Sequence, residues 1–136
     1  MKSYATANWQ GTGKEGSGTL SSKSKVLENT SYDFRSSFEE GTYTNPEELV
    51  AAAHAGCFSM KLSFILGASG FTPASIDTKC TITLEAGAII SSHLELKASV
   101  PRIDAAKFAE CAADAKANCP ISKLLNTEIT MEASLA

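Results

Sequence analysis

Hydrophobic and polar positions alternate weakly in three short segments of the first forty residues, which is typical of β-strands. The first covers residues 4–10, and a turn-rich stretch joins it to the second, at 18–20. The third is SYDFRSSF, residues 31–38, whose aromatic side chains would share one face of a strand. Arg35 would then point from the opposite face. The pattern predicts three strands before the first long helix.

A long helix is predicted to follow these strands. Asn45 is a good N-cap, Pro46 suits the first helical position, and Glu48 completes a capping-box-like pattern. From there the sequence is apolar on nearly every side until Gly67, which favours a buried central helix.

The second half of the chain alternates strands with helices. Residues 75–87 and 88–100 have the clearest strand patterns and should form a hairpin. Two helices, one capped by Asp104 and a short one opened by Pro120, come before a last strand at 127–135. The order predicts an α+β fold in which an antiparallel β-sheet wraps around the long buried helix. We expect one domain covering residues 1–136.

Composition narrows the classes of function. The chain has 136 residues and a net charge of −3, which argues against partners such as nucleic acid or an anionic membrane. The N-terminus lacks the apolar core of a secretory signal. The apolar runs are interrupted and look shorter than the roughly 20 residues that span a bilayer. We therefore expect a cytoplasmic protein whose four cysteines are largely reduced.

Two cysteines stand in contrasting settings. Cys57 lies about three turns into the long helix, where a thiol is normally inert. Cys119 directly precedes Pro120, so it would cap the short helix, whose amides and dipole favour a thiolate. By residue type alone, Cys119 is the better candidate for an attacking thiol, although a plain capping role is also open. Such a pair suggests thiol redox chemistry.

Activation of Cys57 would require a positive charge from elsewhere in the fold. Arg35 is the best candidate, because it lies in a segment rich in aromatic residues. A buried arginine also needs a carboxylate. The available carboxylates are Glu39, Glu40, Glu47 and Glu48.

Three separate motifs carry a resemblance to a known family. NPEELVAAAHAGCFSM, GFTPASIDT and NCPISKLL occur in the expected order. They closely resemble the OsmC (osmotically inducible protein C) branch of the OsmC/Ohr hydroperoxide reductases. The resemblance runs from about residue 32 to the C-terminus. It implies an OsmC-like fold, an intertwined homodimer, and a role in oxidative or osmotic stress defence.

The resemblance also implies a mechanism without metal, haem, flavin or other cofactor. Cys57 would attack an organic hydroperoxide, release the alcohol and become a sulfenic acid. Cys119 would close a disulfide with Cys57, and a dithiol, of the lipoyl type that the Ohr branch suggests, would reopen it. Arg35 matches the family arginine, which stabilises the thiolate, and Glu47 matches the glutamate that pairs with that arginine. Hydrogen peroxide would be a substrate to a varying degree.

The spacing of Glu47 and Cys57 has a physical consequence. Ten residues of straight helix rise about 15 Å, so the two side chains of one chain cannot touch. A two-fold pairing of antiparallel helices would bring Glu47 of one subunit toward Cys57 of the other. We therefore expect composite sites in the homodimer.

Other readings and residues stay open. A redox sensor would use the same cysteines without turnover, and a lipid-binding protein would not need Cys57. His54 could tune the thiol or act as a base, but packing or a structural hydrogen bond is favoured. His93 should face solvent, Cys80 should fill a strand position, and Cys111 should lie on a helix face. The GxGxxG match at residues 11–16 is read as a hairpin turn, because no helix follows it.

Overall fold

The computed structural model describes residues 1–38 and 42–136. The chain divides into two compact units, Met1–Leu49 and Val50–Ala136. Each unit is described below by itself.

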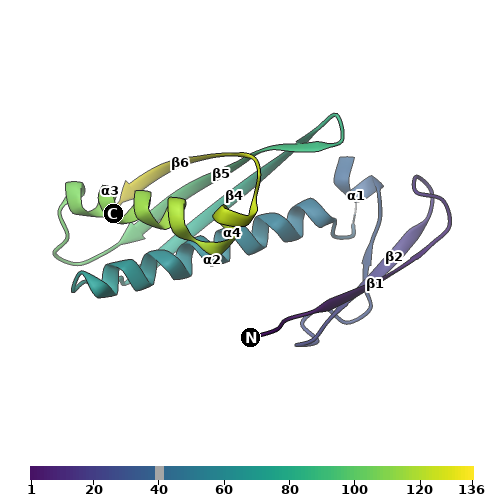
Figure 1. The fold of residues 1–136 in the computed structure, drawn as a ribbon, viewed down its shortest axis with the longest axis horizontal. Coiled ribbons are helices and arrows are strands. Elements are labelled where there is room, and N and C mark those ends of the chain that lie inside the picture. The colour runs from purple at the N-terminus through teal and green to yellow at the C-terminus, as the bar shows by residue number, and fades with distance from the viewer. Residues whose placement is uncertain (39–41) are drawn as a thin grey trace. The chain divides into compact units, whose positions relative to one another are not determined.

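The first unit holds a three-stranded antiparallel sheet in the order β1-β2-β3 (Figure 1). Its strands are β1 Ala5–Gln10, β2 Ser17–Ser22 and β3 Thr30–Tyr32. The rings of Trp9 and Tyr32 pack against each other with centroids 5.4 Å apart. Gly18 lies close to both rings, and a Cβ there would come within 2.6 Å of the Tyr32 ring and 2.9 Å of the Trp9 ring. The first two predicted strands are confirmed.

The third predicted strand is wrong beyond Tyr32. A short helix, α1 Arg35–Phe38, takes the place of its second half. Asp33 accepts a hydrogen bond at Oδ1 from the backbone amide of Ser36, with N and O 2.9 Å apart. Such a side-chain cap competes with strand pairing and starts a helical turn. Arg35 is consequently exposed on a helix and does not point from a strand.

The long helix α2 covers Pro46–Ala68 and begins as predicted. The amide of Glu48 donates to Asn45 Oδ1 over 2.8 Å. After the helix, Gly70 takes a positive φ of 88°, and the Phe71 amide donates back to the Leu66 carbonyl over 2.9 Å. These bonds satisfy carbonyls that the helix end leaves unpaired.

Within one chain, α2 is buried along one stripe only, so the prediction of a helix buried on all sides is wrong at this level. The buried residues recur every four positions and are His54, Phe58, Leu62 and Leu66. Met60 and Phe64, by contrast, are 63% and 72% exposed. The helix is also long and apolar enough to cross a membrane, contrary to the expectation from the interrupted runs. Core helices of soluble proteins pass the same test, and the buried stripe of α2 belongs to the hydrophobic core.

The second unit contains the sheet β4-β5-β6. Strands β4 Ser75–Glu85 and β5 Ala88–Ser99 form the predicted hairpin. Ala86 and Gly87, the two turn residues, both have positive φ (51° and 79°), as in a type I′ turn.

The last strand corrects the prediction of a wholly antiparallel sheet. Strand β6, Glu128–Leu135, pairs with β5 in parallel. The chain returns to the sheet through α3 Ala105–Asn118 and α4 Pro120–Leu124. Such a helical crossover is what a parallel pair requires. The α+β class is confirmed, with two small sheets in place of one antiparallel sheet.

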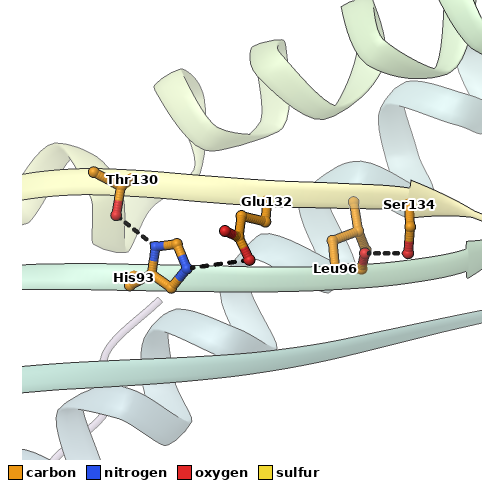
Figure 2. Close-up of polar contacts among 5 residues, drawn as sticks. All are labelled: His93, Leu96, Thr130, Glu132 and Ser134. Atoms are coloured by element: carbon orange, nitrogen blue, oxygen red, sulfur yellow. Dashed lines mark hydrogen bonds and ion pairs between the residues drawn. The ribbon is translucent and has the colours of Figure 1, made fainter.

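The two faces of the β4-β5-β6 sheet differ in character. Leu94, Leu96 and Ala98 of β5 are buried with residues of α2 and α3 in one core cluster. The other face is polar, and Figure 2 shows His93 on it beside Thr130 and Glu132 of β6. His93 Nδ1 lies 2.6 Å from Thr130 Oγ1, and Nε2 lies 3.9 Å from Glu132 Oε2. His93 is therefore half-buried among polar partners, and less open to solvent than expected.

Candidate thiol site

The second unit brings Cys57 and Cys119 together. Cys57 is half-buried on α2, and Cys119 is fully buried where α3 gives way to α4. The two thiols interact with each other, and both are reduced. An accessible thiol therefore lies beside an inaccessible one.

Cys119 is the predicted cap of α4. Its backbone is extended (φ −66°, ψ 140°), and Pro120 occupies the first helical position. The Ser122 amide donates to Cys119 Sγ over 3.3 Å, and Ser122 Oγ lies 3.1 Å from the same sulfur. The turn thus fixes the sulfur against two polar groups of Ser122.

The surroundings of Cys57 raise the pKa of its thiol. Burial is the largest cause. A hydrogen bond from the Ile121 amide lowers the pKa, the neighbouring Cys119 raises it, and the charge of Lys61 lowers it weakly. Because burial prevails, Cys57 is not activated by the second unit alone. It needs a closer positive charge to form a thiolate readily.

The first unit holds the two charged residues predicted for the site. Glu47 is in the first turn of α2, and its Oε2 accepts a hydrogen bond from Ser37 Oγ over 2.9 Å. Glu48 accepts one from Thr44 Oγ1, also over 2.9 Å. In the part of this unit that the structure describes, no ion pair within 4.0 Å joins Arg35 to a carboxylate. Two of the candidate partners, at positions 39 and 40, lie outside the described residues.

His54 makes the structural hydrogen bonds that the sequence favoured. Its ring is fully buried, with Nδ1 2.6 Å from Ser92 Oγ and Nε2 2.8 Å from Ser122 Oγ. Burial lowers the pKa of His54, so the neutral imidazole is the stable form. Cys80 Sγ lies 3.2 Å from Ser92 Oγ, and burial raises the pKa of this thiol. These contacts continue the polar chain that begins at Cys119.

Sequence reasoning missed the two serines of this chain. Ser92 occupies an inward position of β5, in step with Leu94 and Leu96, and a polar residue there is a signal that the pattern contained. Ser122 lies three residues after a cap, where its amide was expected to bond but its hydroxyl was not considered. Cys111, in contrast, is a buried core residue of α3, as expected for a helix-face position.

Comparisons with known proteins agree with this arrangement of motifs. A family model described as OsmC-like protein matches residues 39–134. Peroxiredoxin OsmC of Escherichia coli (strain K12) is 48% identical over 133 residues, which cover 95% of this chain and 93% of that protein. Organic hydroperoxide resistance protein-like 2 of Staphylococcus epidermidis is 29% identical over 138 residues, covering 95% and 92%.

Solved structures share the fold at low sequence identity. An OsmC-like protein from Mycoplasma pneumoniae matches with a TM-score of 0.80 at 15% identity, covering 100% of this chain and 98% of its own. The organic hydroperoxide resistance protein OhrB of Bacillus subtilis matches with a TM-score of 0.68 at 21% identity, covering 98% of each chain. These likenesses concern the fold alone.

Proposed function

The chain belongs to the OsmC-like protein family, and from this premise we propose that it is a cysteine-based peroxidase that reduces organic hydroperoxides to alcohols. The observation that carries the proposal is the pair of reduced, adjacent thiols, of which only Cys57 is accessible to a substrate. The names of the relatives, a peroxiredoxin and a hydroperoxide resistance protein, support the same chemistry.

The reaction follows from the different exposure of the two thiols. The Cys57 thiolate attacks the O–O bond of the hydroperoxide, the alcohol leaves, and Cys57 becomes a sulfenic acid. Cys119 then attacks the Cys57 sulfur, which releases water and leaves a Cys57–Cys119 disulfide. A dithiol reductant, of lipoyl type, reopens this disulfide by thiol exchange. Each turnover thus consumes one hydroperoxide and one dithiol.

Arg35 and Glu47 complete the site as charged residues. The guanidinium stabilises the Cys57 thiolate and the departing oxygen, and Glu47 holds the guanidinium. A positive charge is what the site needs, because burial raises the pKa of Cys57. Glu47 and Cys57 are ten positions apart on one helix, so Glu47 acts on the Cys57 of a second copy.

A homodimer supplies that second copy. The apolar side of α2 that the chain leaves exposed, including Met60 and Phe64, supports this assembly. A two-fold axis would place each copy's α2 against the other and build two composite sites. The two compact units of each chain act together as one functional domain, in the cytoplasm, where the reduced state of the four cysteines is maintained.

Peroxide consumption driven by a dithiol tests the proposed function. Purified protein, cumene hydroperoxide and dihydrolipoamide should give many turnovers per Cys57, and Cys57→Ser should abolish them. Cys111→Ser is the matched control, since Cys111 is buried in α3 away from the proposed chemistry. A single oxidation of Cys57 without recycling would instead identify a redox sensor. Consumption that survives Cys57→Ser would refute the proposal.

A further inference from the structure

A buried chain of hydrogen bonds leads from Cys119 into the core of the second unit. Ser122 Oγ lies 3.1 Å from Cys119 Sγ and 2.8 Å from His54 Nε2. On the far side of the ring, His54 Nδ1 lies 2.6 Å from Ser92 Oγ. Cys119 and His54 are fully buried, and Ser122 is only 8% exposed.

This burial raises a question of proton transfer. Cys119 can attack a sulfenic acid only after its thiol loses a proton, because the thiolate is the nucleophile. Bulk water does not reach its sulfur, which has no accessible surface. The polar side chains in contact with it, within the described part of the chain, are Cys57 and Ser122. Only the Ser122 contact leads on to a base.

We propose that Ser122 and His54 form a proton relay that deprotonates Cys119 as it closes the disulfide with Cys57. The proposal rests on the proposed function. The Cys119 proton passes to Ser122 Oγ while the Ser122 hydroxyl proton passes to His54 Nε2. The Cys119 sulfur bonds to the Cys57 sulfur, the S–O bond of the sulfenic acid breaks, and hydroxide leaves. The relay then returns one proton, so the products are a disulfide, water and neutral His54.

The neighbours of His54 suit a proton acceptor. Burial lowers its pKa, so the ring is neutral and one nitrogen is free to accept. A hydrogen bond from Nδ1–H to Ser92 Oγ would leave Nε2 as the acceptor facing Ser122. The Ser92 hydroxyl can in turn donate to Cys80 Sγ, 3.2 Å away. This direction of donation satisfies every member of the chain.

The titratable groups in contact with this network are thiols. Cys80 of β4 lies 3.9 Å from His54 Nδ1, and Cys119 reaches the ring through Ser122 of α4. From α2 itself, Cys57 touches Cys119. No ion pair to His54 exists among the residues that the structure describes. The transient imidazolium is therefore balanced by the thiolate that forms beside it.

A different route for the proton must be separated from this one. Ser122 also lines a surface hollow of about 400 Å³ between α3, α4 and β6, whose walls include Lys116, Leu125 and Met131. Water in this hollow could take the proton from Ser122 without His54. A variant that keeps the hydrogen bond but removes the base distinguishes the two routes.

The test measures the two oxidation steps separately in the full-length protein. One equivalent of cumene hydroperoxide is added, samples are quenched in acid, and mass spectrometry follows the Cys57 sulfenic acid and the disulfide over time. Ser122→Ala breaks the relay while keeping the backbone amide on Cys119. His54→Gln can bond Ser122 but cannot accept a proton at neutral pH. Ser59→Ala is the matched control, because it removes a half-buried hydroxyl that bonds Thr78 outside the relay, over 2.7 Å.

We expect unchanged sulfenic acid formation in all variants. Disulfide closure should slow by tenfold or more in Ser122→Ala and His54→Gln, about 1.4 kcal/mol per factor of ten, and stay unchanged in Ser59→Ala. Ser122→Thr, which keeps a hydroxyl, should restore closure. In the wild type the closure rate should be level above the His54 pKa and fall below it, while in Ser122→Ala it should rise with pH throughout.

Other outcomes overturn the relay or its premise. If closure in Ser122→Ala equals that of the wild type, or if His54→Gln closes normally, the proton does not travel to His54. If closure and sulfenic acid formation slow together, the residues have only a structural role. If Cys57 of the wild type is not oxidised at all, the proposed function itself fails, which is a distinct result.

Discussion

At the scale of single residues, adjacent thiols have different environments. Cys57 is half-buried, and burial raises its pKa, whereas Cys119 is fully buried and accepts a backbone amide at the start of α4. The roles of both could be predicted, because each lies in a recognisable motif. Ser92 and Ser122 could not, since their hydroxyls gain meaning only when β5 and α4 meet the same face of His54.

Replacement of Arg35 by methionine should slow Cys57 oxidation by about tenfold to a hundredfold at neutral pH. Each unit by which the pKa rises reduces the thiolate fraction about tenfold. Because the neutral thiol is the form that gains, the rate should recover as pH increases. Stopped-flow oxidation at several pH values checks this, with exposed Arg102→Met as the control. A rate that is reduced equally at every pH would contradict a role in thiolate stabilisation.

At the scale of elements, periodicity and capping residues predicted most helices and strands. The segment at 31–38 failed because alternation could not reveal the hydrogen bond between Asp33 and Ser36 that starts α1. The direction of β6 failed for another reason. Its sequence alternates equally well in either direction, and the crossover through α3 and α4 decides the parallel pairing. Local pattern therefore predicts elements better than their partners.

The buried stripe of α2 should dominate the stability of the second unit. Leu62→Ala, at a fully buried core position, should lower the free energy of unfolding by about 3 kcal/mol, because a cavity remains. Leu124→Ala, on a side chain that is 73% exposed, should change it by less than about 0.5 kcal/mol. Urea denaturation measures both. Equal losses in the two variants would show that the stripe is not the core.

At the scale of the whole molecule, the exposed apolar side of α2 calls for a partner. A helix that is apolar on most sides is normally covered, yet Met60 and Phe64 are open in the single chain. Sequence pattern predicted that the helix would be covered, but it could not tell burial by the same chain from burial by a second copy. The family resemblance supplied that distinction.

Phe64→Asp should convert the proposed dimer to a monomer and reduce peroxidase activity by at least tenfold. A carboxylate in a closed apolar interface must be desolvated without a partner. Sedimentation velocity and the turnover assay check both effects, and Lys123→Asp, an exposed charge change on α4, is the control. A fully active monomer would rule out composite sites.

The central claim is that Cys57 and Cys119 form one redox pair, and peptide mapping tests it most directly. Reduced protein is treated with one equivalent of an organic hydroperoxide, alkylated and digested. We predict a rapid Cys57–Cys119 disulfide, its absence in Cys57→Ser, and a trapped Cys57 sulfenic acid in Cys119→Ser. If both thiols stay reduced while the hydroperoxide persists, or if Cys57 pairs with Cys80 instead, the account is contradicted.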